Sequence, residues 1–124
     1  MWTYFSVAVG GTLGCWARFA MTNLVQAVLG RGFPYATLSI NVLGSLLMGF
    51  LFIATLERLT VSPELRTGLL TGFLGGYTTF STFSMETLLL VEQGEGLKAV
   101  LYVLLSVVLG FAGAFAGAYI ARNL

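Results

Sequence analysis

Four long stretches of this chain carry almost no charged residues, and this pattern restricts the folds that the chain can adopt. A helix that crosses a bilayer needs about 20 mostly apolar residues, and each stretch is about that long. They run over Trp2 to about Leu29, where only Arg18 interrupts, then Gly32–Leu56, Thr67–Met85 and Ala99–Ala121. The sequence therefore predicts an all-α membrane protein in which residues 1–124 form a single domain of four transmembrane helices.

Composition supports lipid as the solvent of this chain and argues against several classes of function. Charged residues make up 9% of the chain, against roughly 25% in soluble domains. The net charge of +1 leaves no basic face for nucleic acid. Histidine is absent and Cys15 is the single cysteine, which excludes an internal disulfide and argues against a zinc or haem site. Because the chain also has no acidic dyad, we predict that it is not an enzyme.

The third stretch contains two adjacent glycines, Gly75 and Gly76, followed by hydroxyl side chains and phenylalanines. We expect this helix to be broken near Gly75–Thr79, and broken backbone at membrane depth is tolerated only where protein buries it or a cavity is lined by it. Discontinuous helices of this kind often mark ion and substrate sites. The unwound carbonyls from Gly75 through Thr78 could bind Na⁺, or the kink could be satisfied by Ser or Thr side chains and water. The residues alone leave both open.

Phe80 and Phe83 are spaced i, i+3 among these hydroxyls, so we expect their rings to point the same way. Packing or contact with lipid is the default role of a membrane phenylalanine. The positive edge of an aromatic ring can also approach an anion, while hydroxyl and amide donors replace the water around it. Conduction requires an ion to leave as readily as it enters, so a pore of dipoles and ring edges suits a small anion.

Five further polar residues could carry chemistry, and three of them have a plainer alternative. Arg18 anchors the first helix at the membrane interface, or it attracts anions into a vestibule, or it ties helices together. Glu86 is either an ordinary charge at a helix end or a partner of Arg18. Asn41 is either an interhelical tie or a donor to a passing ion. Tyr102 and Ser106, spaced i, i+4, present two hydroxyls on one face.

Small residues recur at helical spacing and predict close seams between helices. The stripes comprise Ser6, Gly10, Gly14, Arg18 and Thr22 in the first span, Thr37, Asn41, Gly44, Ser45 and Met48 in the second, and Tyr102, Ser106, Gly110, Gly113 and Gly117 in the fourth. Helix packing explains these glycines without any chemistry. It explains Arg18, Asn41 and the hydroxyl cluster less well.

Basic residues are divided evenly between the two ends of the expected bundle. Arg58, Arg66 and Arg122 lie on the side of the termini, and Arg18, Arg31 and Lys98 lie toward the other side. Orientation in the membrane follows the Lys/Arg bias of short loops, which is close to nil here. We therefore expect the chain to insert in both directions and to pair as an antiparallel, dual-topology homodimer.

Three segments of the chain form distinctive motifs: GGYTTFSTFS at Gly75–Ser84, GGTLGCWAR at Gly10–Arg18 and ATLSINVLGSLLMG at Ala36–Gly49. The first closely resembles the signature of the Fluc (CrcB) family of fluoride channels, and the other two resemble the family's first-helix and second-helix patterns. The resemblance covers essentially the whole chain in order. It implies a passive, fluoride-selective channel in the inner (plasma) membrane that exports cytoplasmic fluoride, with two pores per antiparallel homodimer.

The resemblance also implies roles for individual residues. The implied fluoride-pore residues are Asn41, Phe80, Ser81, Thr82, Phe83, Tyr102 and Ser106. Arg18 and Glu86 match the family's vestibule charges. Gly75 and Thr78 match residues whose backbone carbonyls hold a structural Na⁺ at the dimer interface.

Two alternatives compete with a fluoride channel. A small proton-coupled drug exporter also has four helices, but such exporters use a membrane-embedded glutamate in the first helix, and this chain has no acidic residue before Glu57. A non-transporting scaffold or accessory subunit would need the seams but not the broken helix with hydroxyls and ring pairs. The chain departs from the family pattern at Ala36, where glycine is common, and at Tyr77, where leucine is common; both changes leave the expected site residues intact.

Overall fold

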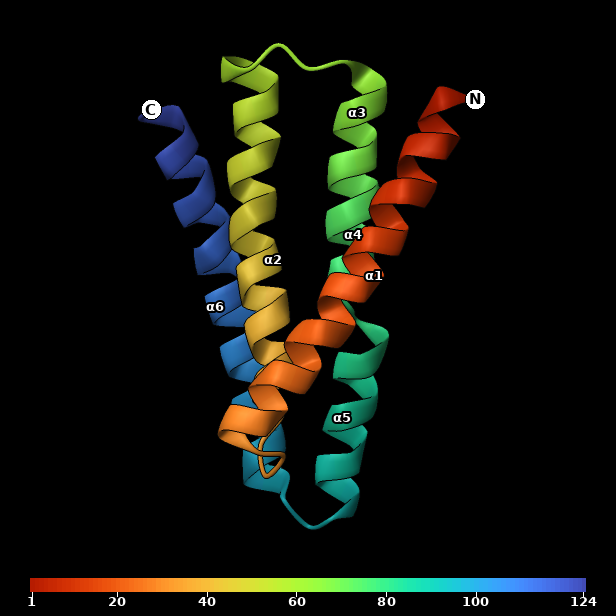
Figure 1. Cartoon of the computed structure of the whole chain (residues 1–124). Coiled ribbons are helices and arrows are strands. Elements are labelled where there is room, and N and C mark those ends of the chain that lie inside the picture. Colours follow the sequence, from red (N-terminus) through yellow and green to blue (C-terminus); the bar gives the residue numbers. More distant parts are fainter.

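The computed structural model describes the whole chain, residues 1–124, as four helical rods joined by short loops (Figure 1). The rods are α1 (Trp2–Leu29); α2 (Tyr35–Ile53) with the π-helical turn η1 (Ala54–Arg58); α3 (Pro63–Thr67), the π-helical segment η2 (Gly68–Leu74), α4 (Gly75–Tyr77) and α5 (Ser81–Glu92); and α6 (Gly96–Arg122). Both termini lie at the same end of the molecule as the loop between η1 and α3 (Figure 1). The predicted all-α architecture with four helical rods is confirmed.

Local sequence explains where the rods turn. Gly30 and Gly94 each have a φ of 78°, a left-handed conformation that glycine adopts without a Cβ penalty. Each follows the end of a helix, as is common for glycine. The Leu65 N–H donates to the Ser62 hydroxyl at 3.2 Å, and Pro63 opens α3. Proline suits a first helical position because an N–H there would have no helical partner.

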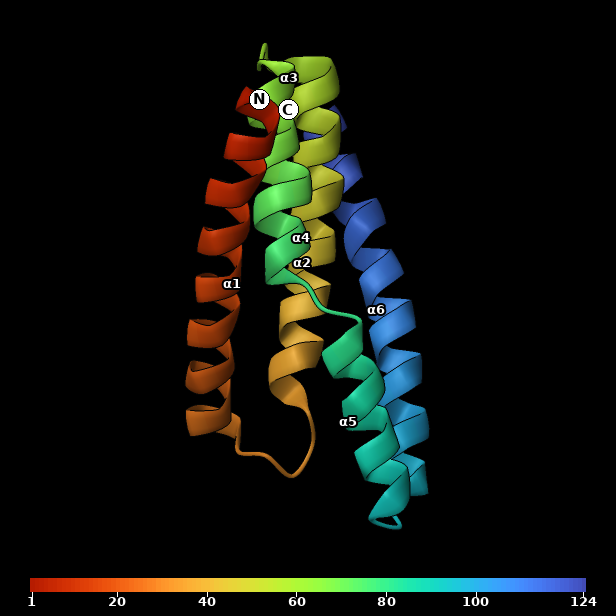
Figure 2. The ribbon, with the colours of Figure 1, turned by 90° about the vertical axis from the view of Figure 1, so that its right-hand side faces the viewer.

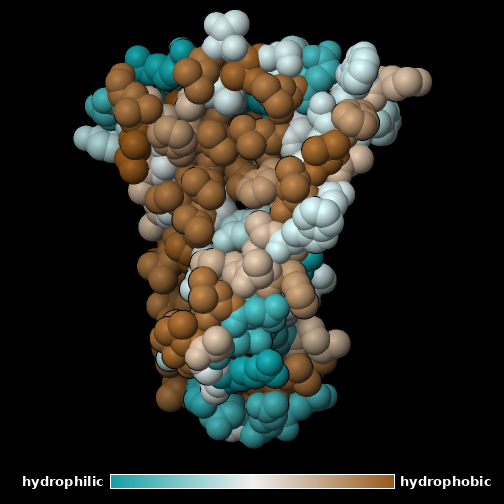
Figure 3. Space-filling view, viewed as in Figure 1, coloured by the Kyte–Doolittle hydropathy of each residue, from teal (hydrophilic) through white to brown (hydrophobic).

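Large apolar side chains lie on the outside of the rods. Two helices, Tyr35–Arg58 and Gly96–Arg122, are long and apolar enough to cross a membrane, and only 28% and 22% of their most apolar windows are buried. A core helix of a soluble protein would be mostly buried. Figure 3 shows hydrophobic residues along most of one face and hydrophilic residues gathered toward its ends. Neither the first nor the third rod is both long and apolar enough by this criterion, because α1 is more polar and the third rod is interrupted.

Glycines create two close seams between rods. A Cβ built on Gly14 of α1 would overlap the carbonyl oxygen of Phe73 in the third rod. Across the other seam, a Cβ built on Gly117 of α6 would overlap the carbonyl oxygen of Leu46 in α2. Small residues allow this approach because no side chain separates the two backbones. The predicted glycine seams of the first and fourth spans are therefore confirmed.

The third rod is broken at Thr78–Phe80, between α4 and α5. Thr78 has extended backbone, with φ −83° and ψ 160°. The predicted break is confirmed, but the expectation that the glycine pair lies in the unwound part is wrong. Gly75 is helical, with φ −63° and ψ −37°, and Gly76 belongs to the same helical turn. A Cβ on Gly76 would lie 2.8 Å from the Gly11 carbonyl oxygen, so close packing on α1 requires this glycine.

The break moves the third rod from one neighbour to another. α4 lies beside α1, whereas α5 runs along α6 and away from α1 (Figure 2). Both halves of the rod also contact α2. The unwound residues therefore face α2, and this is where the candidate site is built.

Candidate functional site

Asn41 of α2 holds the unwound backbone in place. Its Nδ2 donates to the Thr79 carbonyl oxygen at 2.9 Å, and its Oδ1 accepts from the Thr79 N–H at 2.9 Å. Thr79 lies between two helices, where backbone groups have no helical partner and need another one. The structure thus makes Asn41 a tie between α2 and the third rod. One Nδ2 hydrogen remains for a further acceptor.

Arg18 of α1 binds the end of the first half of the third rod. Its Nε donates to the Gly76 carbonyl oxygen at 3.2 Å. The C-terminal end of a helix carries a partial negative charge, which favours a cation. Arg18 and Glu86 line the same cavity, but the ion pair considered between them is not formed. The guanidinium is engaged by backbone, and the carboxylate is engaged by another residue.

Several backbone carbonyls at the break receive no hydrogen bond, and those of Gly75 and Thr78 are among them. The Leu74 carbonyl accepts from both the N–H of Thr78, at 3.0 Å, and its hydroxyl, at 2.9 Å. The Thr79 N–H is taken by Asn41 and does not return to the helix. The carbonyl oxygens of Gly75 and Thr78 are therefore left without a donor. Free carbonyl oxygens at a half-helix end are ligands that suit a cation such as Na⁺.

Aromatic rings from three segments cluster beside the break. The ring centroids of Phe80 and Phe83 are 5.9 Å apart with planes at 59°, so these side chains are adjacent, as their spacing predicted. Phe83 meets Tyr102 of α6 edge to face at 5.0 Å, and Phe33 of the α1–α2 loop meets Tyr102 at 5.7 Å. Phe80 is 78% exposed, whereas Tyr102 is fully buried. Phe83 therefore joins an exposed ring to a buried one.

Polar groups in this region are joined through Tyr102. Its hydroxyl donates to Glu86 Oε1 at 2.9 Å and so ties α6 to α5. Thr37, which is 4% exposed, lies one turn before Asn41 and lines the same cavity as Glu86. Ser106 lies one turn after Tyr102, and its Oγ is buried with no hydrogen-bond partner. A buried hydroxyl without a partner costs free energy, and Ser106 lines none of the cavities described below.

The remaining predicted hydroxyls lie at the start of α5. The Thr79 Oγ1 accepts from the Thr82 N–H at 3.3 Å and lies 3.5 Å from Ser81 Oγ. A hydroxyl that accepts from an early helical N–H stabilises the helix start. Ser81 is exposed, and Thr82 lines a cavity together with Arg18.

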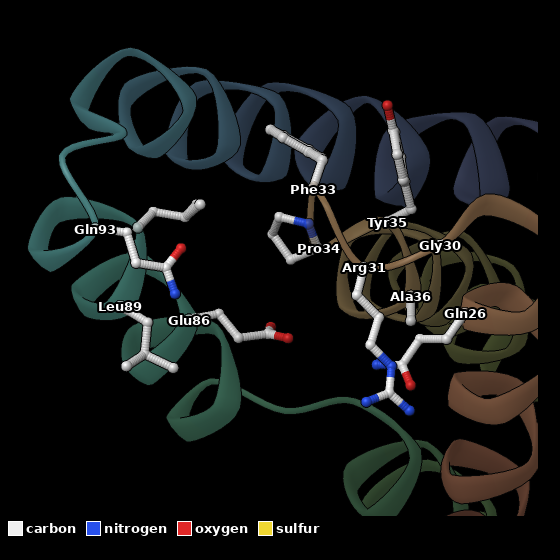
Figure 4. Close-up of a pocket in the computed structure, with 11 residues that line it drawn as sticks. Gln26, Gly30, Arg31, Phe33, Pro34, Tyr35, Ala36, Glu86, Leu89 and Gln93 are labelled. Carbon is white, nitrogen blue, oxygen red and sulfur yellow. The ribbon is translucent and has the colours of Figure 1, made fainter.

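Two cavities adjoin at Glu86. The loop-end cavity, of about 170 Å³, lies between the end of α1, the α1–α2 loop and α5, and its lining includes Gln26, Arg31 and Glu86. Figure 4 shows Arg31 extending toward Gln26, with Glu86 pointing into the cavity from α5. The central cavity, of about 400 Å³, shares Gln26 and Glu86 with it and reaches Arg18 and Thr79.

A third space continues past the break. The ring cavity, of about 360 Å³, shares Thr79 with the central cavity and is lined by Asn41, Phe80 and Phe83. Three cavities therefore follow one another from the α1–α2 loop to the aromatic rings. All three are lined in part by polar side chains.

Several lining residues were not expected as site residues, among them Gln26, Arg31, Phe33 and Thr37. Gln26 extends the four-residue spacing of Arg18 and Thr22 by one more turn, so the stripe itself could have identified it. Arg31 and Phe33 lie in a loop, where no helical periodicity indicates which side chain points inward. In the sequence, Thr37 belongs to the stripe of small residues in the second span, which indicates packing and no other role.

Comparison with known proteins identifies the family of this arrangement. The model of the family described as "CrcB-like protein, Camphor Resistance (CrcB)" matches residues 5–118. The chain belongs to the CrcB family. A relative named fluoride-specific ion channel FluC, from Acidithiobacillus ferrooxidans, is 62% identical over 98% of this chain and 97% of its own length.

Other CrcB-family relatives carry the same name. The FluC of Geobacter sulfurreducens is 49% identical over the full length of both chains. That of Methylococcus capsulatus is 54% identical over 97% of this chain and 53% of its own length. The resemblance found in the sequence is confirmed, and the chain is a membrane protein of this family.

Proposed function

We propose that this chain is a fluoride-specific ion channel through which cytoplasmic fluoride leaves passively across the inner (plasma) membrane. CrcB-family membership and the names of full-length relatives support this function. The structural observation that supports this function most directly is the row of three cavities that passes the break. The first two cavities share Glu86, and the last two share Thr79. Irregular backbone that lines such a space is the usual form of an ion site within a membrane.

Neutral groups would replace the water around fluoride along this row. The edges of Phe80 and Phe83 are weakly positive, and Asn41, which keeps one unused Nδ2 hydrogen, lines the same cavity. The remaining donors proposed for the pore are the hydroxyls of Thr82, which lines the central cavity, and of Ser81, Tyr102 and Ser106, which line none of the three cavities. Such groups attract an anion without trapping it, so the ion can leave as readily as it enters.

Charged groups would act at the approach to this row. Arg18 would supply a positive charge, but its donation to the Gly76 carbonyl reduces its hold on an anion. Glu86 is oriented by the Tyr102 hydroxyl. We therefore assign Arg18 and Glu86 to the vestibule and leave the narrow part of the pore to neutral donors.

We also propose that residues 1–124 form one channel domain that pairs as an antiparallel homodimer with two pores. Gly75 and Thr78 supply two free carbonyl oxygens, and the equivalent pair from a second copy would give a structural Na⁺ four oxygen ligands. The even division of basic residues between the two ends supports both insertion directions. Bound Na⁺ would fix the two breaks relative to each other, while the donors of the pore would act on fluoride.

The two alternatives find less support. α1 contains no glutamate that could carry protons for drug export. A scaffold would not require a broken helix tied by Asn41 beside unpaired carbonyls. Membership of a family of ion channels also argues against an enzyme.

Fluoride efflux from liposomes that contain the purified protein tests the proposal. A potassium ionophore carries the compensating charge, and protein-free liposomes serve as the control. We expect rapid fluoride release without a pH gradient, and little release when chloride is the internal anion. Release driven only by a pH gradient would identify a proton-coupled carrier, and no release would support a scaffold.

A further inference from the structure

Arg31 is the one basic side chain of six that has no partner in the structure. Arg18 donates to the Gly76 carbonyl, Arg58 to the Arg122 carbonyl, and Arg66 to Thr55 Oγ1 at 2.9 Å; Arg122 pairs with Glu57 at 3.8 Å, and Lys98 pairs with Glu95 at 3.9 Å. No hydrogen bond or ion pair of this kind engages the Arg31 guanidinium. The donors of the Arg31 guanidinium are therefore all free within the chain.

Arg31 lies at the entrance to the row of cavities. Arg31 is exposed to solvent, and it also lines the loop-end cavity. In Figure 4 the guanidinium lies beside the Gln26 amide, so a charged donor and a neutral donor occupy the same wall. Gln26 also lines the central cavity. An anion that arrives at Arg31 is therefore already beside the row of cavities.

We propose that Arg31 gathers fluoride at the mouth of the loop-end cavity and raises its local concentration there. This inference rests on the proposed fluoride conduction. A charged cleft raises the local concentration of a small ion and its rate of entry, and the effect falls steeply with ionic strength. Arg31 acts on entry, whereas the groups around Phe83 and Asn41 act on passage.

Glu86 keeps this attraction weak. Its carboxylate points into the same cavity from α5 (Figure 4), so the mouth contains one charge of each sign. The Tyr102 hydroxyl holds Glu86, and no ion pair forms with Arg31. Arg31 can therefore attract an anion from water, while Glu86 prevents the mouth from retaining it.

The test measures fluoride current in planar bilayers at fixed low fluoride while an impermeant salt changes the ionic strength. Raising ionic strength from about 0.01 M to about 1 M shortens the screening length from roughly 30 Å to roughly 3 Å. The ratio of the two currents within one bilayer cancels the number of channels. For Arg31→Gln we expect the current at low ionic strength to fall about threefold, as for one exposed charge near the ion path. At high ionic strength the current should be nearly unchanged.

Arg31→Lys keeps the charge and should retain the salt dependence of the unaltered protein, while Arg31→Glu should lower the current at low ionic strength further than Arg31→Gln. Arg122→Gln is the control, since Arg122 is also exposed but lies at the end of the molecule that holds the termini and is paired with Glu57. Each variant is checked for an unaltered size-exclusion profile.

An Arg31→Gln current that is unchanged at low ionic strength would overturn the inference while leaving the proposed channel intact. A loss of equal size at both ionic strengths would also overturn it, because such a loss indicates a structural role. The absence of fluoride current from the unaltered protein would remove both proposals.

Discussion

The two halves of the third rod are built in opposite ways. The first half, Pro63–Tyr77, is packed by glycine against α1 and buries Leu70, Leu74 and Tyr77. The second half, α5, buries Leu90 alone and runs along α6. Backbone contacts dominate the first half, whereas polar and aromatic side chains dominate the second.

This difference separates two tasks that a channel must combine. The first half is held rigidly because its backbone touches that of α1, and it ends in the free carbonyls of Gly75 and Thr78. The second half presents hydroxyls and rings to the cavities. A fixed carbonyl site and an adaptable lining can therefore occupy neighbouring turns of one rod.

The largest effect should come from crowding the rigid half. Gly14→Ala places a Cβ against the Phe73 carbonyl, and overpacking of this kind costs about 3 kcal/mol. We expect a lower thermal midpoint in detergent and little fluoride flux. Gly11→Ala is the matched control, because its Cβ would lie at an ordinary 3.8 Å from the Gly72 carbonyl. Equal stability of the two variants would contradict the distinction between the halves.

Removing the tie between α2 and the unwound residues of the third rod should have the next largest effect. Asn41→Leu leaves the part-buried Thr79 N–H and carbonyl without their partner, at a cost of up to about 1–3 kcal/mol for each group. Fluoride flux should fall at least about tenfold, since 1.4 kcal/mol corresponds to that factor. Asn23→Leu, at an exposed position of α1, serves as control. Normal flux in Asn41→Leu would show that the break holds its shape without the amide.

Side-chain substitutions in the second half should act on flux and spare folding. Phe83→Ile removes the ring edge that lies between Phe80 and Tyr102. Aromatic edge contacts are worth about 0.5–1.5 kcal/mol, equivalent to about two- to tenfold in flux. Phe80→Ile should also slow flux, and the exposed Phe115→Ile of α6 should not. Unchanged flux in both pore variants would identify the rings as packing residues.

The smallest effect should follow from Gly75→Ala. Gly75 is helical, and its Cβ would lie 3.9 Å from the Leu70 carbonyl, which is ordinary contact. Alanine gains up to about 1 kcal/mol over glycine within a helix, so stability should be equal or higher. Flux and its response to Na⁺ depletion should be unchanged within about twofold. Gly76→Ala, crowded by the Gly11 carbonyl, should be harmful, and the reverse order of the two variants would contradict the structure.

Much of the fold follows from local signals in the sequence. Charge-free runs of membrane length predict the four rods, and the run of hydroxyls after a glycine pair predicts the break. The role of the glycines themselves could not be predicted, because both unwinding and close packing require glycine. Whether Gly76 allows unwinding or close packing depends on its neighbour in the fold. That neighbour is Gly11, which is distant in the sequence.

The candidate site was predicted in its residues but not in its contacts. Asn41 and Arg18 were recognised as unusual within a membrane, yet their partners are backbone groups of Thr79 and Gly76, whose exposure depends on where the helix breaks. Side-chain patterns do not reveal which carbonyls become free. Arg31 was counted only as a loop charge, because a loop position carries no periodic signal of its direction.

The interruption of the third rod also bears on how the protein is made. α2 and α6 are apolar enough to leave the translocon for lipid one at a time. α5, with 12 residues, is too short to span the hydrocarbon by itself, since a helix rises 1.5 Å per residue. The third rod should therefore enter the bilayer together with the already synthesised α1, whose glycine face receives it. Biogenesis would then depend on the same seam that later fixes the carbonyls at the break.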